Sequence, residues 1–147
     1  MTTIKPDHLP TIVYVEDNAG DAMLLEEAVR VTGHSLRLQV IDKGDNALHY
    51  FHIKVTARDV PPPHCILLDA HLPVVTGAQL LRYVRAHAIF DQTPVYIFAS
   101  VAEYQDMLTE GLIPARNFLT KPSSWDGFLQ LANLLARSAE QSMDSRG

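Results

Sequence analysis

Short apolar runs alternate along this chain with stretches in which apolar residues recur at helical spacing. The runs are rich in β-branched and aliphatic residues, which is typical of strands buried on both faces of a parallel sheet. They predict strands over Thr11–Val15, Leu36–Ile41, Cys65–Leu68, Val95–Phe98 and Asn117–Leu119. The periodic stretches predict helices over Ala22–Val31, Asp45–Ile53, Gly77–Ala86, Ala102–Thr109 and Ser124–Ala139.

Local signals mark where some of these elements begin and end. Asn18 is a good N-cap for the first helix, and Asp21 lies three residues later, beside the positive end of that helix. Gly33 is suited to close the same helix as a C-terminal glycine. The segment 54–63 is expected to be a loop, because it ends in three consecutive prolines that stop regular structure.

Strands that alternate with helices indicate βαβ units and therefore a parallel sheet. Right-handed crossovers place helices on both faces, so the predicted fold class is α/β, with a doubly wound five-stranded parallel sheet. Ligands of such sheets bind beyond the carboxyl ends of the strands. Residues 11–139 are expected to form one domain, between a loose lead-in at residues 1–10 and a polar, frayed tail at residues 140–147.

Composition narrows the function classes. The chain has 147 residues, a length that suits one domain, and a formal net charge of -5. No run of Lys and Arg occurs, so neither nucleic acid nor an anionic membrane is expected as a direct partner. The single cysteine excludes a disulfide framework. The N-terminus lacks a signal-peptide pattern, and no apolar run approaches the ~20 residues that span a bilayer, so we expect a cytoplasmic protein.

Chemically active side chains follow four of the predicted strands. Glu16 and Asp17 follow the first strand, Asp69 the third, Ser100 the fourth and Lys121 the fifth. Taken singly, each is most simply a turn, cap or solvated loop residue. Parallel strands, however, bring their carboxyl ends to one edge, and three neighbouring carboxylates would be neutralised by a hard cation such as Mg²⁺. The pattern predicts a site where a carboxylate attacks a phosphoryl donor while Lys121 and the metal neutralise charge.

Four motifs make this chain similar to a known family. They are Val-Glu-Asp-Asn at 15–18, Leu-Leu-Asp-x-x-Leu-Pro at 67–73, a glycine at 77, and Thr-Lys-Pro at 120–122. Together they resemble the receiver domain of two-component response regulators. The long segment 51–63 and the lack of an output domain resemble the small single-domain regulators that pair with bacterial and cyanobacterial phytochrome kinases. The resemblance implies a flavodoxin-like fold with strand order 2-1-3-4-5.

The resemblance also implies roles for the residues at the sheet edge. Asp69 would be the phosphoacceptor, and Lys121 would pair with the phosphoryl group and precede a cis peptide bond. Asp17 would bind Mg²⁺ directly, and Glu16 would act beside it through water. His71 would supply its backbone carbonyl to the metal, which leaves its side chain free to vary.

The switch that reads the phosphoryl group departs from the family pattern. Phe118 occupies the position of the switch aromatic, without the hydroxyl of the commoner Tyr. Receivers usually place Thr or Ser directly after the fourth apolar residue of strand four, and its hydroxyl binds the phosphoryl group. That position is Ala99 here, and Ser100 comes one residue later. Because a shift of one residue turns a side chain to the opposite face of a strand, it stays open whether Ser100 replaces the missing hydroxyl.

The implied function is that of a single-domain response regulator. It would accept a phosphoryl group on Asp69 from a sensor histidine kinase, catalyse only its own phosphotransfer and dephosphorylation, and signal through protein contacts. The alternative is a phosphorylation-independent docking module, which Ala99 favours and the acid cluster disfavours. A dehalogenase-type hydrolase would need an acid at His71, and a flavodoxin would need a Ser/Thr/Gly-rich loop after the first strand, where this chain is acidic.

A homodimer is also expected, through the last predicted helix. A regulator without an output domain must signal through its own surface. The helix carries an apolar stripe that offers more area than one packed face needs, although the stripe is equally well explained as core. Its members are Trp125, Phe128, Leu129, Ala132 and Leu135.

Overall fold

A computed structural model describes residues 8–57 and 59–146. Its central sheet contains the strands β1 (Thr11–Val15), β2 (Arg37–Ile41), β3 (Cys65–Asp69), β4 (Val95–Phe98) and β5 (Phe118–Leu119). All neighbouring strands are parallel and their order is β2-β1-β3-β4-β5, as predicted. The helices are α1 (Ala19–Thr32), α2 (Gly44–Thr56), α3 (Gly77–Arg85), α4 (Val101–Leu108) and α5 (Trp125–Arg146).

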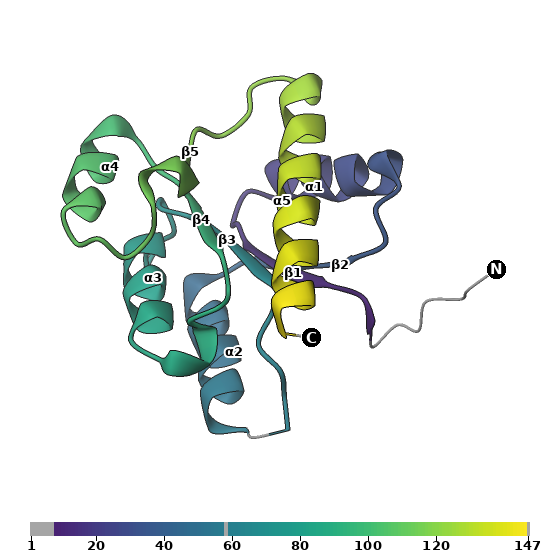
Figure 1. The fold of residues 1–147 in the computed structure, drawn as a ribbon. Coiled ribbons are helices and arrows are strands. Elements are labelled where there is room, and N and C mark those ends of the chain that lie inside the picture. The colour runs from purple at the N-terminus through teal and green to yellow at the C-terminus, as the bar shows by residue number, and fades with distance from the viewer. Residues whose placement is uncertain (1–7, 58, 147) are drawn as a thin grey trace.

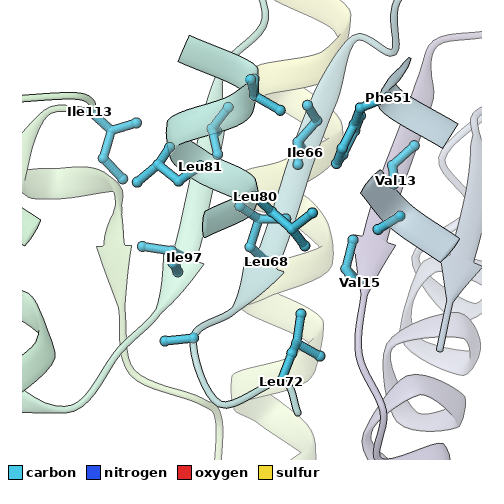
Figure 2. Packing of buried hydrophobic residues seen from close by; sticks show 14 of the residues in the cluster. Val13, Val15, Phe51, Ile66, Leu68, Leu72, Leu80, Leu81, Ile97 and Ile113 are labelled. Carbon is cyan, nitrogen blue, oxygen red and sulfur yellow. The ribbon is translucent and has the colours of Figure 1, made fainter. Parts of the chain in front are cut away.

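Helices cover both faces of the sheet, so the domain has three layers (Figure 1). Alternate residues of β1 point to opposite faces: Val13 and Val15 pack under α2 and α3, whereas Ile12 and Tyr14 pack under α1 and α5. All five residues of the central strand β3 are buried, as a strand covered on both faces requires. Figure 2 shows the first of these cores, in which Phe51 and Leu80 meet strand residues.

The predicted helix signals are confirmed at both ends of α1. The Asn18 side chain accepts a hydrogen bond from the Asp21 backbone N–H over 3.0 Å, which satisfies a donor at the start of the helix. Gly33 ends the helix with a φ of 75°, in the left-handed region that glycine adopts readily. Two short 3₁₀ helices, Ala88–Phe90 and Ala115–Asn117, were not predicted.

The predicted frayed tail at residues 140–147 is wrong for the residues described. Helix α5 continues to Arg146, and Ser142 is buried and donates a hydrogen bond to the Gln92 carbonyl. The Arg146 guanidinium donates to the carbonyls of Pro62 and Pro63 at 2.9 and 2.7 Å. The last turn therefore belongs to the domain, because tertiary hydrogen bonds hold it. Most of the lead-in, residues 1–7, lies outside the described residues.

Three further expectations need correction. Helix α2 extends to Thr56, past the predicted boundary, which shortens the expected loop before β3. Trp125 is 40% exposed and lies at the first position of α5, outside the buried stripe that the helix turns toward the sheet. No cis peptide bond occurs among the described residues, so the bond between Lys121 and Pro122 is trans.

Candidate functional site

The carboxyl ends of β1, β3 and β5 bring the predicted acidic and basic residues together. Val15 pairs with Leu68 across β1 and β3, so the residues that follow them, Glu16 and Asp69, lie side by side at the sheet edge. The Glu16 backbone N–H donates to the Ile41 carbonyl over 3.0 Å, which continues the ladder past the end of β1. The pairing of β1 with β3 therefore places the Glu16 and Asp69 carboxylates close together through the backbone alone.

A single ammonium group joins three carboxylates at this edge. Lys121 Nζ lies 2.8 Å from Glu16 Oε1, 3.0 Å from Asp69 Oδ2 and 3.0 Å from Asp21 Oδ2. Its side chain is 32% exposed, so the ion pairs are only partly shielded from solvent. The surrounding carboxylates outweigh the effect of burial, which opposes the charge, and hold the pKa of Lys121 above its ordinary value. Lys121 is therefore a cation at the centre of the site.

Glu16 is fully buried, and its carboxylate is held from several sides. The Tyr14 hydroxyl donates to Oε1 over 2.7 Å, and the Asn18 backbone N–H donates to Oε2 over 3.2 Å. Burial is the main cause that raises the pKa of Glu16, and the contact with Lys121 acts in the opposite direction. Burial and the neighbouring carboxylate also raise the pKa of Tyr14, so the hydroxyl remains a donor.

Asp69 is 3% exposed, and each of its oxygens has a partner. The His71 backbone N–H donates to Oδ1 over 2.9 Å, while Lys121 contacts Oδ2. Burial acts to raise the pKa of Asp69, but the His71 N–H, Glu16 and Lys121 together outweigh it, so the pKa lies below its usual range. Asp69 is therefore ionised at neutral pH, as a carboxylate nucleophile must be.

Glycine is required where α3 approaches this loop. A Cβ atom on Gly77 would lie 2.3 Å from the Asp69 carbonyl oxygen and 2.8 Å from the Ala70 Cα. Any other residue would push the start of α3 away from the acceptor loop. This contact gives a physical reason for the glycine eight residues beyond Asp69 in the sequence.

The residues present suit a hard cation. Glu16, Asp17 and Asp69 each offer a carboxylate oxygen, and these oxygens all lie within 4.8 Å of one another. Glu16 and Asp69 are buried, whereas Asp17 is exposed and opens the cluster to solvent. All three candidate ligands are carboxylate oxygens, the ligand type that Mg²⁺ prefers, and Mg²⁺ usually completes its coordination with water and phosphate oxygens. The role predicted for the His71 carbonyl stays a prediction.

The end of β4 is built differently. Ala99 and Ser100 line a cavity of about 220 Å³ together with Asp69, His71, Phe98 and Lys121. The Ser100 hydroxyl accepts a hydrogen bond from the Glu103 backbone N–H over 3.3 Å, as the N-cap of α4. The Ser100 oxygen therefore acts as the acceptor that caps α4, and Ala99 offers no hydroxyl to the cavity. Phe118 packs edge-on against Tyr104 of α4, with 4.9 Å between ring centroids.

Three residues of the site were missed by sequence reasoning. Asp21 was assigned only to the helix end, yet it contacts Lys121; its place in the first turn of the helix that follows Glu16 and Asp17 was the available signal. Tyr14 was counted only as a strand residue. Glu103 contacts the His71 side chain, with 3.0 Å between His71 Nε2 and Glu103 Oε1. No sequence pattern indicated that contact.

Comparisons with known proteins agree with this geometry. Residues 12–133 match the model of the response regulator receiver domain. The chain therefore belongs to the response regulator receiver family of two-component systems. The two-component response regulator ARR6 from Arabidopsis thaliana is 30% identical over 125 residues, which cover 80% of this chain and 64% of that protein. The matched part of this chain thus spans less than two thirds of the length of that relative.

Two solved structures show the same fold. The bacteriophytochrome response regulator AtBRR matches with a TM-score of 0.66 and 28% identity, over 86% of this chain and 92% of that chain. The Mn²⁺-bound form of response regulator Rcp1 matches with a TM-score of 0.69 and 22% identity, over 84% and 88% of the two chains. None of the helices in residues 8–57 and 59–146 has the length and apolar character needed to cross a membrane.

Proposed function

We propose that this receiver accepts a phosphoryl group on Asp69 from a sensor histidine kinase and transmits the signal through protein–protein contacts. The observation that carries the proposal is the Lys121 ammonium, 3.0 Å from an ionised and otherwise buried Asp69 carboxylate. A phosphoryl donor can reach the Asp69 carboxylate from solvent, because Asp69, Ala99 and Lys121 line a cavity. The chain would act only on itself, in phosphotransfer and in dephosphorylation, and would not turn over a separate substrate.

In the proposed step, an Asp69 oxygen forms a bond to phosphorus as the bond between phosphorus and a histidine nitrogen of the kinase breaks, and the electron pair of the broken bond stays on that nitrogen. The His71 N–H holds Oδ1, so Oδ2 is the oxygen available once Lys121 shifts its contact to the phosphoryl group. Lys121 then neutralises charge that builds on the transferred oxygens. Mg²⁺ bound by Asp17, Asp69 and, through water, Glu16 would supply further charge neutralisation when present.

Similar proteins support the choice of metal and partner. The Rcp1 structure contains Mn²⁺, an ion that takes oxygen ligands as Mg²⁺ does. AtBRR is described as a bacteriophytochrome response regulator, so the proposed kinase is of the bacteriophytochrome type. The proposal retains the cytoplasmic location expected from the sequence.

A homodimer remains part of the proposal, with a smaller surface than the sequence suggested. Most of the predicted stripe on α5 is core, because Phe128, Ala132 and Leu135 are buried. The large apolar side chains that remain exposed on α4 and α5 are Val101, Leu108 and Trp125. Light scattering at high protein concentration, with and without beryllofluoride, should show a dimer. A monomer under both conditions would remove this part of the proposal.

The central test is phosphoryl transfer to Asp69. The full chain is incubated with acetyl phosphate and Mg²⁺, or with a phosphorylated bacteriophytochrome kinase, and the adduct is mapped by mass spectrometry. We expect one adduct on Asp69, and no adduct in Asp69→Asn. Asp45→Asn, a matched change at an exposed acid in the first turn of α2, should be labelled as the unaltered protein is. Labelling that persists in Asp69→Asn would contradict the assignment.

The docking-module alternative rests on Ala99, which removes the hydroxyl that reads a phosphoryl group. It predicts that Asp69→Asn leaves partner binding unchanged. A pull-down with the kinase, comparing the unmodified chain, the phosphorylated chain and Asp69→Asn, separates the two functions. We expect phosphorylation to change binding in the unaltered protein only, whereas equal binding in all three samples would favour the docking module.

A further inference from the structure

A second cavity lies at the opposite edge of the sheet from Asp69. It has a volume of about 620 Å³, within the range of small-molecule sites, and it is formed by the amino ends of β1 and β2, the C-terminal half of α2 and the loop before β3. Its wall includes the Tyr50 ring and the three consecutive prolines Pro61–Pro63. Apolar and polar atoms contribute nearly equal shares of this surface, so the cavity offers both ring contacts and hydrogen-bonding groups.

The described part of the chain places two cationic side chains in the wall of this cavity. Among the described residues that line it, Arg37 and Lys54 carry charge and none is a carboxylate, in a chain whose formal net charge is -5. Neither side chain forms an ion pair with an acid among the described residues. Lys54 is half-buried, with Nζ 4.9 Å from the centroid of the Tyr50 ring. Burial lowers the pKa of Lys54, which is the expected consequence of a partly desolvated cation without a counter-ion.

His64 adds a hydrogen-bond donor of defined tautomer. Its Nδ1 accepts the Thr11 backbone N–H over 3.0 Å, so the proton of the neutral ring lies on Nε2. Burial, with a smaller contribution from Arg146, lowers the pKa of His64 and keeps the ring neutral. The cavity wall therefore contains a neutral imidazole with an Nε2–H donor in addition to the two cationic donors, and all three are donor types that anion oxygens accept.

The loop that walls the cavity is held in place without a ligand. Arg146 donates to the carbonyls of Pro62 and Pro63, and the Thr93 hydroxyl donates to Pro63 over 3.1 Å. Prolines lack backbone N–H groups, and these hydrogen bonds occupy two of their carbonyls. The loop therefore contributes mainly apolar ring surface, and a ligand would not have to order it.

We propose that this cavity binds a small organic anion, with a carboxylate or phosphate group between Arg37 and Lys54 and an apolar ring against Tyr50 and Pro61–Pro63. The carboxylate and phosphate forms share this recognition chemistry, and the experiment distinguishes them. The inference does not depend on phosphoryl transfer to Asp69, because the two sites lie at opposite edges of the sheet.

The test is an NMR titration of the full chain, without Mg²⁺, using benzoate, phenyl phosphate and, as an uncharged probe of similar ring size, benzyl alcohol. We expect one or both anions to shift the backbone amides of Gln39, Tyr50, Lys54 and His64, with little effect near Asp69. Benzoate alone would identify a carboxylate site, and phenyl phosphate alone a phosphate site. Shifts confined to the Asp69 edge, or no shifts with either anion, would overturn the proposal, as would equal binding of benzyl alcohol.

Matched variants show whether the cations carry the binding. Lys54→Met should lower the affinity for the anion about tenfold, the usual effect of removing a charged hydrogen-bond partner. Lys43→Met, at the exposed start of α2, changes the net charge equally and should leave affinity unchanged. Arg37→Gln, on the exposed edge strand, gives an independent variant if Lys54→Met fails to fold. Equal loss of affinity in the Lys43 variant would indicate a general charge effect and refute the site.

Discussion

The ends of β1, β3 and β5 differ in construction from the end of β4, although all meet at one edge of the sheet. On the first side, Lys121 contacts Glu16, Asp21 and Asp69, and two of these acids are buried. On the β4 side, Ala99 lines the same cavity as Asp69 and Lys121 and carries no hydroxyl. The first set of contacts is dense and polar, whereas the second is sparse.

This difference separates two tasks that receivers usually combine. Accepting a phosphoryl group needs a nucleophile, a cation and a metal site, and the chain has side chains for each. Reading the group needs a contact that is stronger in the modified state than in the unmodified one. The usual hydroxyl for that contact is absent at Ala99, and the Ser100 hydroxyl caps α4. We therefore expect efficient acceptance and a weak conformational response.

The largest effect is expected on the acceptor side, from Asp17→Ala. Asp17 is the exposed member of the carboxylate cluster, so its loss would remove the proposed direct metal ligand without disturbing the core. Changes in the outer shell of metal sites already cost roughly 10–100-fold in affinity, and a direct ligand should cost at least as much. An NMR titration with Mg²⁺ measures the change. Asp45→Ala serves as the control, and unchanged affinity in the Asp17 variant would remove Asp17 from the metal site.

The next effect concerns the β4 side, where Ala99→Thr restores the missing hydroxyl. A hydrogen bond to a charged group contributes about 1.5–3 kcal/mol. The ratio of active to inactive states in the presence of beryllofluoride should therefore rise about tenfold or more. The measurement is the chemical-shift change across residues 99–107 when the mimic is added.

Ala102→Thr provides a matched control for this substitution, since Ala102 is exposed in the first turn of α4. It should leave the response as it is in the unaltered chain. If the unaltered chain already shows a full shift, and Ala99→Thr adds nothing, another donor reads the phosphoryl group. The end of β4 would then differ from the ends of β1, β3 and β5 in its side chains, but that difference would not affect how the protein responds to the phosphoryl group.

A smaller effect is expected from Asp21→Asn. The Asp21 carboxylate lies 3.0 Å from Lys121 Nζ and competes with an incoming phosphoryl group for the same cation. Because the pair is partly exposed, removing one charge should raise the rate of labelling by acetyl phosphate only severalfold. Asp126→Asn, in the first turn of α5, is the control for a general charge effect. A lower rate would show instead that Asp21 positions Lys121 for the reaction.

Most of the fold was predictable from the sequence because its central strands, β1 and β3, are buried on both faces. The central strand β3 has no exposed residue, so its apolar run is unbroken and ends at Asp69. The C-terminal turn was not predictable in this way, because its residues are polar. Ser142 and Arg146 are fixed by hydrogen bonds to Gln92 and to Pro62 and Pro63, which are far away in the sequence.

The site was predictable to the extent that it lies at strand ends. Glu16, Asp69 and Lys121 meet because parallel strands end at one edge, and the sequence order of the strands places them there. Contacts made by helices were harder to foresee. Glu103 lies on α4, and its contact with His71 depends on how that helix packs, which the apolar pattern of eight residues does not determine.

The smallest effect tests the one side-chain link between the acceptor loop and α4 that we identify among the described residues. His71 Nε2 lies 3.0 Å from Glu103 Oε1, and the two side chains are 67% and 30% exposed. His71 also holds Asp69 through its backbone N–H, which a substitution retains. His71→Ala should therefore leave phosphoryl acceptance unchanged and weaken only the transmission to α4. Exposed ion pairs contribute about 0–1 kcal/mol to stability, so the ratio of active to inactive states should fall by no more than about fivefold.

The measurement is the beryllofluoride response of α4 amides, in the unaltered chain and again with Ala99→Thr in place. If the His71 side chain carries part of the signal, His71→Ala reduces the response in the Ala99 protein. His71→Ala should have a smaller effect in the Ala99→Thr background, because the introduced hydroxyl then supplies a direct contact to the phosphoryl mimic in addition to the His71 contact. His49→Ala, at an exposed position of α2, should have no effect in either background. An equal response with and without the His71 side chain would show that the two sides of the site communicate through the backbone alone.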